Sequence, residues 1–426
     1  MILKKLKLIY DASIVVNTTN ANWARSGVYF SALNLLKEFA KRDDIELVLY
    51  CKTDDKNKAR KFLKDLLKKD FACIFEFVPS KLIIALKRTI EKLPPLISKP
   101  FYKANDLRKK LKNKNTQKKP NTQNPNEYNA CYLSAAYDLP ARFKHDESII
   151  KYAIAYDVMP LIFPQYYKDS VDGWLQTFKI FNNYFSISQH TKKDYLKHLE
   201  HLKEQNITTA LLACDESFKP ANNEQINLAK QKYKIPENKK YIFSLCTLEP
   251  RKNLIRTLKT FIEFIKKNNI DDLVFVLGGG HWEIFIKELE KSIDDLGAYK
   301  DKILKIGYVD DKDLAPLYSG ALFFVYTSQY EGFGLPPLEA MSCGSAVITS
   351  DNSSLPEVVG DAGIMIAYDS DEAHIKAYEK YYFDENFRKE NAKKGLERSG
   401  LFSWQKCADI MVNKIKDDIE KAKINL

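Results

Sequence analysis

The sequence predicts an α/β protein built from two domains. Its 426 residues exceed what one hydrophobic core usually encloses, and a hydrophobic content of 45% is ordinary for a globular chain. Several apolar runs suit buried strands, and each is followed by a turn and a segment that suits a helix. Strands that alternate with helices in this way are typical of parallel sheets covered by helices.

The first strand and helix unit opens the first half of the chain. Residues 5–15 form a strand-like run, and residues 25–42 follow with a helical pattern. The apolar stripe that this helix should bury consists of Val28, Leu33, Leu35, Leu36 and Phe39.

A second unit begins at residue 151, where an apolar strand is followed by an Asp and a proline-bounded turn. We expect Tyr156 and Asp157 at the carboxyl edge of the sheet, where open α/β sheets bind ligands. A phenol has a reference pKa of about 10, so Tyr156 is not a general base near neutral pH. It is equally a ligand contact or a structural tyrosine. Residues 185–199 then suit a strand and a helix start, with Ser188 or Thr191 as the N-cap.

The polar residues 213–225, which include Pro220, break the pattern and predict a hinge between the domains. We therefore expect an N-terminal domain of residues 1–220 and a C-terminal domain of residues 221–402. Residues 403–426 suit one long helix at the end of the chain.

Residues 328–344 are the most informative segment for function, because two carboxylates flank a glycine-rich turn that runs into a helix. Glu331 lies on the strand side and Glu339 about one turn into the helix. Glycines let a backbone approach a ligand closely, and a helix start favours phosphate. Carboxylates beside such a turn can hold the hydroxyls of a sugar nucleotide. The turn consists of Gly332, Phe333, Gly334 and Leu335.

Two further features follow predicted strands. The three glycines 278–280, with Gly279 at their centre, come after an apolar run and form a loop at the carboxyl edge. Arg251 and Lys252 can neutralise a diphosphate, Arg through its fork of donors and Lys as a point charge. Taken alone, the glycines are equally a plain turn, and an isolated basic pair is more often a solvated surface.

Four blocks of the second half resemble glycosyltransferase family 4, the glycosyl transferases group 1, in order and at family-like spacing. They are residues 244–254, 305–318, 328–344 and 350–364. Members of that family are retaining enzymes that use sugar nucleotides. The resemblance implies the GT-B fold, in which two Rossmann-like domains face each other and a C-terminal helix returns to the first domain.

The resemblance also implies roles for individual residues. Glu331 would contact the donor sugar and Glu339 the ribose, while Arg251 and Lys252 would neutralise the diphosphate during catalysis. The backbone around Val309 would meet the base. No cofactor and no metal ion are implied, because Arg, Lys and a helix N-terminus neutralise the diphosphate.

Two positions depart from common family patterns. Tyr156 stands before Asp157 where relatives often carry a histidine that lines the donor sugar. Cys246 and Thr247 lie where many relatives carry an arginine, and Arg251 is the candidate to replace its charge. Gly27 resembles the glycine by which the N-terminal domain approaches the donor or acceptor, and it is equally a simple loop glycine.

The residues and the resemblance together predict a glycosyltransferase of the hexosyltransferase type, and the resemblance implies that it retains the anomeric configuration. It would move a sugar from a nucleoside diphosphate to a hydroxyl of a glycan or lipid-linked glycan, in bacterial surface polysaccharide or glycoconjugate assembly. Two other classes stay open. A sugar-nucleotide-binding protein would bind the donor without turnover, and a GT-B epimerase would need acid and base groups of its own.

Positive charge is concentrated in residues 81–127, which hold thirteen Lys or Arg against three acidic residues. The first part of this basic insertion suits an interfacial helix, and the second is a polar loop. It is either a solubilising insertion or a contact to an anionic membrane surface. We expect no nucleic-acid binding, because the loop lacks interleaved aromatic residues.

Seven scattered cysteines indicate reduced thiols, and no apolar run approaches the length of a membrane span. We therefore expect a cytoplasmic protein, and a membrane contact of the basic insertion would place it on the cytoplasmic face of the inner membrane. Six dispersed histidines and acidic pairs in polar turns predict no metal site.

Overall fold

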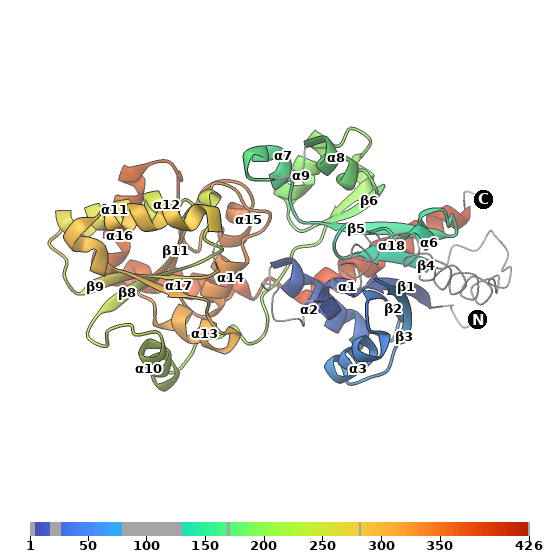
Figure 1. Ribbon diagram of the computed structural model, residues 1–426, viewed down its shortest axis with the longest axis horizontal. Helices are drawn as coiled ribbons and strands as arrows, with labels where there is room; N and C mark the ends of the chain where they lie inside the picture. Colours follow the sequence, from blue (N-terminus) through green and yellow to red (C-terminus); the bar gives the residue numbers. More distant parts are fainter. Residues whose placement is uncertain (1–4, 18–26, 79–129, 168–170, 281–282, 425–426) are drawn as a thin grey trace, which may run out of the picture. The chain divides into compact units, whose positions relative to one another are not determined.

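The computed structural model describes residues 5–17, 27–78, 130–167, 171–280 and 283–424 (Figure 1). The chain divides into two compact units. The first consists of Met1–Ala153 and Val412–Leu426, and the second of Ile154–Met411. The basic insertion of residues 81–127 lies outside the described residues. The domain boundary near residue 220 stays a prediction.

The first half of the chain forms a seven-stranded sheet in the order β3-β2-β1-β4-β5-β6-β7. Strand β1 is parallel to β2 and β4, β2 to β3, β4 to β5, and β6 to β7. The strands are β1 (Leu6–Asp11), β2 (Ile45–Thr53), β3 (Ala72–Phe77), β4 (Ala130–Ser134), β5 (Ile149–Ala155), β6 (Asn183–Ser186) and β7 (Ile207–Thr209). Its helices are α1 (Ser13–Asn17), α2 (Gly27–Lys41), α3 (Lys56–Leu67), α6 (Ala141–Lys144), α7 (Met159–Ile162), α8 (Val171–Phe178) and α9 (Gln189–His198), with the 3-10 turns η1 (Pro164–Tyr166) and η2 (Glu204–Asn206).

The opening strand and helix differ in detail from the sequence prediction. The strand stops at Asp11, because its carboxylate accepts from the backbone N–H of Ser13 at 3.0 Å and α1 begins there. The predicted stripe of α2 was partly wrong, since Val28 and Leu33 are only half-buried. Tertiary contact selected a neighbouring face instead, which buries Tyr29, Ala32, Leu35, Leu36 and Phe39.

The N-cap prediction for α9 is confirmed for Ser188. Its hydroxyl oxygen accepts from the backbone N–H of Thr191 at 2.9 Å, which satisfies one of the amides that the first helical turn leaves without a partner. Thr191 is fully buried and serves a different purpose, described below.

The second half of the chain forms a six-stranded parallel sheet in the order β10-β9-β8-β11-β12-β13. In Figure 1, α11 and α12 lie on one side of this sheet and α10 and α13 on the other. The strands are β8 (Lys240–Leu245), β9 (Leu273–Gly278), β10 (Ile303–Gly307), β11 (Phe323–Tyr326), β12 (Val347–Ser350) and β13 (Ile364–Ile366). The helices are α10 (Asn223–Lys232), α11 (Leu254–Lys267), α12 (Glu283–Asp294), α13 (Asp311–Gly320), α14 (Leu335–Ser342), α15 (Leu355–Val359), α16 (Asp371–Phe383) and α17 (Glu385–Ser399), with η3 (Pro250–Lys252) and η4 (Gly297–Lys302). Two parallel, Rossmann-like sheets are therefore confirmed.

The last helix, α18 (Trp404–Ile424), begins in the second unit and ends in the first. In the first unit the Lys416 ammonium pairs with the Asp44 carboxylate at 2.6 Å, and the Tyr152 hydroxyl donates to Asp418. The predicted return of the C-terminal helix to the first domain is confirmed. In the part of the chain that the structure describes, no helix has the length and apolar character that a bilayer crossing needs.

We expect Ile415→Ala to weaken the attachment of α18, because the Ile415 side chain is fully buried. Removing a buried isoleucine side chain costs about 2–5 kcal/mol, and urea unfolding should record that loss. Ile410 lies on the same helix but is 40% exposed, so Ile410→Ala is the matched control, with a change within about 0.5 kcal/mol. Equal effects of the two substitutions would contradict the packing of α18.

Candidate functional site

The candidate site lies at the carboxyl ends of β8, β9 and β11 in the second unit. Strand β11 is buried along its whole length, and the chain then turns through residues 327–334 into α14. The same edge receives η3 after β8 and the glycine loop after β9. In a parallel sheet this is the edge at which loops build ligand sites.

An ion cluster joins η3 to this turn. Glu331 Oε1 accepts from Arg251 Nη1 at 2.8 Å and from Lys252 Nζ at 2.5 Å. Arg251 Nη2 also pairs with Glu249 Oε1 at 2.7 Å, and Lys252 Nζ donates to the Tyr326 hydroxyl at 2.5 Å. The four charged side chains are all nearly buried, at 7–11% exposure. The structure thus brings together the three residues predicted to act in catalysis.

Opposite charges in this cluster favour the ionised forms of Glu331 and Arg251. Burial by itself would raise the pKa of Glu331, but the neighbouring Arg251 and Lys252 outweigh burial and lower that pKa to about 2. Glu331 and Glu249 likewise outweigh burial at Arg251 and raise the pKa of its guanidinium. Burial and the neighbouring Arg251 act in the other direction on Lys252 and lower the pKa of its ammonium, although Glu331 favours the charged form.

Hydrogen bonds from serines hold the turn that carries Glu331. Ser354 Oγ donates to the carbonyls of Glu331 and Phe333, at 2.9 and 2.7 Å. Ser353 Oγ accepts from the Glu331 backbone N–H at 3.0 Å, and Arg251 Nη1 donates to the Tyr330 carbonyl at 2.8 Å. The Glu331 carboxylate is positioned by backbone contacts on both sides, as a preorganised binding group requires.

Gly332 lies against the segment that follows β5. A Cβ at Gly332 would stand 2.1 Å from the Tyr156 carbonyl oxygen and 3.2 Å from Asp157 Cβ. Thr191 Oγ1 lies 3.1 Å from both the Tyr156 and the Gly332 carbonyl oxygens. Tyr156 is buried, and burial also raises the pKa of Asp157, whose carboxylate accepts from the Met159 N–H at 2.9 Å. The two predicted residues after β5 thus contact the glutamate turn.

Two other glycines are explained by conformation and contact. Gly334 precedes α14 with φ of 114°, a backbone state that disfavours other residues. Gly279 has φ of 127°, and a Cβ there would stand 1.8 Å from the Cys246 carbonyl oxygen. Val309 is buried and its Cγ2 would be 3.1 Å from a Cβ at Gly278. The glycine loop and the segment after β10 therefore pack together.

Glu339 lies on α14, the helix that follows the glutamate turn, and has different hydrogen-bond partners from Glu331. Its Oε2 accepts from the Tyr318 hydroxyl at 2.9 Å, and the side chain is half-buried. Burial raises the pKa of Glu339 to about 7, although the Tyr318 hydrogen bond acts in the opposite direction. The two glutamates of the motif thus differ, because Glu331 has two cationic partners and Glu339 has none among the described residues.

The remaining predicted residues are placed as follows. Gly27 is the first residue of α2 and belongs to the first unit. The Phe333 ring packs edge-on against Phe402, with 5.9 Å between centroids. Leu335 is the first residue of α14, so its N–H has no acceptor within the helix.

Sequence reasoning missed five residues that build the site: Glu249, Tyr326, Tyr318, Thr191 and Glu357. Glu357 accepts from the backbone N–H groups of Gln189 and His190, at 2.7 and 2.6 Å, and so caps α9. Glu357 lies in the matched block 350–364, which was a usable signal. Glu249 lies only two positions from its partner Arg251. The partners of Tyr326, Tyr318 and Thr191 depend on the tertiary fold, because Lys252, Glu339, Tyr156 and Gly332 lie 21 to 141 positions away along the chain. In the described residues no group of three or more His, Cys, Asp or Glu could hold a metal ion.

Comparison with known proteins gives a consistent result. Residues 225–398 match the family model "Glycosyl transferases group 1". An Escherichia coli O-antigen chain mannosyltransferase B is 32% identical over 234 residues, which are 54% of this chain and 59% of that protein. The E. coli serotype-specific mannosyltransferase WbdA is 28% identical over 270 residues, 61% of this chain and 32% of that protein. The chain thus spans from about one third to three fifths of the length of these relatives.

A solved structure of Anabaena HepE in complex with UDP and glucose has a similar fold. Its TM-score is 0.64 at 12% identity, with 99% of this chain and 100% of that chain covered. At this identity the likeness concerns the fold alone.

We expect Glu331→Gln to destabilise the second unit by about 3 kcal/mol at pH 7, because two buried cations lose their shared carboxylate. Since the pKa of Glu331 is lowered on folding, its contribution is complete above about pH 4.5 and disappears as the pH falls towards 2. In urea unfolding, the variant should therefore have a lower free energy of unfolding than wild type at pH 7, and the two values should converge as the pH falls towards 2. Equal stability at pH 7 would contradict the cluster.

The raised pKa of Glu339 has the opposite consequence. Folding favours the protonated carboxyl, so this group lowers stability as the pH rises from about 4.5 through 7. Glu339→Gln should gain stability relative to wild type over that range, on the order of 2 kcal/mol at pH 8. Glu397→Gln, an exposed carboxylate on α17, is the control. A stability difference independent of pH would show that Glu339 titrates normally.

Proposed function

We propose, on the premise that this chain belongs to the glycosyl transferases group 1 family, that it transfers a hexose from a nucleoside diphosphate to a hydroxyl of a glycan or lipid-linked glycan. The observation that carries the proposal is the buried cluster of Glu331 with Arg251 and Lys252 at the carboxyl edge of a Rossmann-like sheet. Cations and a carboxylate held side by side can bind a diphosphate next to a sugar hydroxyl.

The cluster also suggests how the donor enters. Arg251 and Lys252 now share one carboxylate oxygen of Glu331. A diphosphate can take over part of the hydrogen bonding of both cations, since charge-assisted bonds to phosphate are strong and Arg binds it with two parallel donors. Glu331 would then turn a freed carboxylate oxygen towards the donor sugar. Donor binding thus exchanges one set of ion pairs for another and leaves no buried cation unpaired.

In the transfer step, the bond between the anomeric carbon and the diphosphate oxygen breaks while the acceptor oxygen bonds to that carbon. The departing phosphate can take the acceptor proton, and retention of configuration follows from the family resemblance. Arg251, Lys252 and the start of α14 would stabilise the negative charge that develops on the phosphate. Glu331 would orient the sugar, so the protein's contribution is positioning and charge stabilisation.

Glu339 would hold the ribose. Its Oε2 accepts from Tyr318, which orients the carboxyl, and its other oxygen remains to accept from a ribose hydroxyl. The backbone near Val309 and Gly279 would meet the base, and Tyr156 and Asp157 would line the sugar side through their contact with Gly332.

The sugar and the acceptor follow from the relatives rather than from the site. Mannose is the first sugar to test, because the curated relatives cited above are named mannosyltransferases. O-antigen is named for one of them, so we place this chain in bacterial surface polysaccharide assembly.

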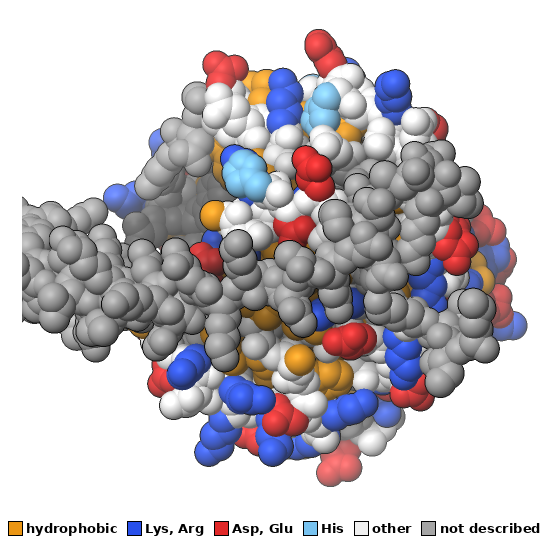
Figure 2. Space-filling model, turned by 90° about the vertical axis from the view of Figure 1, so that its right-hand side faces the viewer, with side chains coloured by type: hydrophobic (Ala, Val, Ile, Leu, Met, Phe, Trp, Pro, Cys, Tyr) orange, Lys and Arg blue, Asp and Glu red, His pale blue; other side chains and the backbone are white. Residues whose placement is uncertain are grey.

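A lipid-linked acceptor would bring the protein to an anionic membrane surface. Helix α3 exposes Lys56, Lys58, Arg60, Lys61 and Lys64. Figure 2 shows Lys and Arg gathered with some carboxylates on the lower part of the face where α3 lies. These cations add to those of the basic insertion, and each can contribute roughly 1 kcal/mol near anionic lipid.

Calorimetric titration of UDP, GDP and ADP and of their sugar conjugates, with GDP-mannose first, tests the donor site. We expect one nucleotide to bind selectively and Glu339→Ala to weaken it at least about tenfold, because a hydrogen bond to a charged group contributes about 1.5–3 kcal/mol. Glu397→Ala should bind like wild type. No binding of any nucleotide would overturn the proposal.

The same experiment extended to an acceptor separates catalysis from binding alone. With an identified acceptor, Glu331→Gln should reduce transfer at least about a hundredfold. Full activity of that variant would falsify the role of Glu331. Donor binding by wild type without turnover on any acceptor would instead make the protein a sugar-nucleotide-binding protein, and interconversion of the donor sugar without transfer would make it an epimerase.

A further inference from the structure

A cavity of about 630 Å³ opens at the amino edge of the six-stranded sheet. Its wall includes Lys240 at the start of β8, Asp272 before β9, Leu322 before β11 and Ala346 before β12. Glu331 follows β11 at the other end of the same strands. The cavity is therefore separated from the proposed donor site by the length of the sheet, and the inference drawn from it does not rest on the proposed function.

Positive charge predominates in the wall of this cavity. Five cations line it: Lys230, Lys239, Lys240, Arg388 and Lys389. Two carboxylates, Glu237 and Asp272, also contribute. Lys240 pairs with Asp272 at 3.0 Å and Lys389 with Glu385 at 2.6 Å, so these two lysines are compensated inside the protein.

The positive charges of Lys230 and Arg388 differ, because their hydrogen-bond acceptors are backbone carbonyls. Lys230 Nζ donates to the backbone carbonyls of Glu237 and Lys239, at 3.0 and 3.3 Å. Arg388 Nη1 donates to the Tyr381 carbonyl. Within the described ranges, neither cation forms an ion pair with a carboxylate, and both are half-buried. Burial lowers the pKa of the Arg388 guanidinium and outweighs the nearby Glu385 carboxylate, which raises it, so this cation is partly desolvated.

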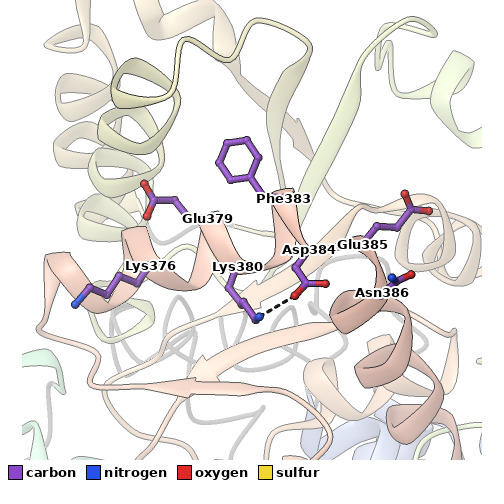
Figure 3. A pocket seen from close by; sticks show the side chains of 7 residues that line it. All are labelled: Lys376, Glu379, Lys380, Phe383, Asp384, Glu385 and Asn386. Carbon is purple, nitrogen blue, oxygen red and sulfur yellow. Dashed lines mark hydrogen bonds and ion pairs between the residues drawn. The ribbon is translucent and has the colours of Figure 1, made fainter.

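A larger cavity, of about 730 Å³, provides a contrast (Figure 3). It lies where α16 meets α17, and its cations have carboxylate partners. Lys380 pairs with Asp384 at 2.8 Å, as the dashed line in Figure 3 marks, and Lys376 pairs with Glu372 at 2.6 Å. Glu379 pairs with Lys267 at 2.8 Å. An anion has little to gain there, because the charges are already balanced.

We propose that the amino-edge cavity binds a phosphorylated small molecule, with the phosphate held by Arg388 and Lys230. A phosphate dianion supplies the charge that both half-buried cations lack, and Arg offers it two parallel donors. The volume lies within the range of small-molecule sites, so a sugar-sized body fits beside the phosphate. Ala321, Leu322 and Ala346 supply an apolar wall for that body.

Isothermal titration of glucose 6-phosphate and of inorganic phosphate into the full chain tests this site. We expect both to bind wild type, and the double variant Lys230→Gln, Arg388→Gln to bind them at least about tenfold more weakly, because two charge-assisted hydrogen-bonding groups are lost. Lys230→Gln alone should give an intermediate loss. This single variant keeps the test valid if loss of the Arg388 contact to Tyr381 disturbs folding, which unfolding temperatures would reveal.

Two controls identify the site. Lys312→Gln removes an exposed cation on α13 and should leave binding unchanged. Lys252→Gln removes a cation of the proposed donor site and should also leave it unchanged. Absence of phosphate binding to wild type, or equal binding to wild type and the double variant, would overturn the proposal. Loss of binding in Lys252→Gln alone would assign the phosphate to the donor edge and overturn it as well.

Discussion

The shared carboxylate of Glu331 is the interaction on which the candidate site depends. Arg251 and Lys252 are buried, and a buried cation is costly unless it is paired and hydrogen-bonded. Both cations pair with Glu331, which follows β11, whereas the cations themselves follow β8. The cluster therefore links the segment after β8 to the turn after β11. The low pKa of Glu331 follows from that pairing. The same grouping of charges that holds these loops together is the one that we propose to bind a diphosphate and a sugar hydroxyl.

A glycine at a loop can admit a ligand or another segment of the backbone, and the sequence pattern does not distinguish the two. Gly332 was expected to admit a ligand close to the backbone, and Gly279 was expected either in a ligand loop or in a plain turn. Each lies against a carbonyl of the protein itself, Gly332 against that of Tyr156 and Gly279 against that of Cys246. The close approach therefore positions the loops. Cys246 stands where many relatives carry an arginine, and its carbonyl meets the glycine loop while Arg251 provides the charge nearby. Backbone packing and charge are thus supplied by different residues.

The two edges of the C-terminal sheet differ in how their charges are balanced. At the carboxyl edge, the buried cations share a carboxylate that lies within hydrogen-bond distance. At the amino edge, Lys230 and Arg388 donate to backbone carbonyls, and among the described residues neither pairs with a carboxylate. A carbonyl dipole neutralises a cation less completely than a carboxylate does. We therefore expect the amino edge to attract an anion more strongly than the carboxyl edge does. The net charge of the chain does not reveal this difference between the edges, because the difference depends on which cations are paired with carboxylates.

The sequence by itself determined the local structure and the motif. Alternating apolar runs predicted the strands, Ser188 predicted the cap of α9, and residues 328–344 predicted a strand, a tight turn and a helix start with carboxylates on both sides. These features depend on neighbours along the chain. Only the tertiary structure decided which face α2 buries, and that Glu331 pairs with two cations about 80 positions away while Glu339 meets a tyrosine. Their opposite pKa shifts followed from those contacts, because desolvation and nearby charge depend on distances in space, which separation along the chain does not reveal.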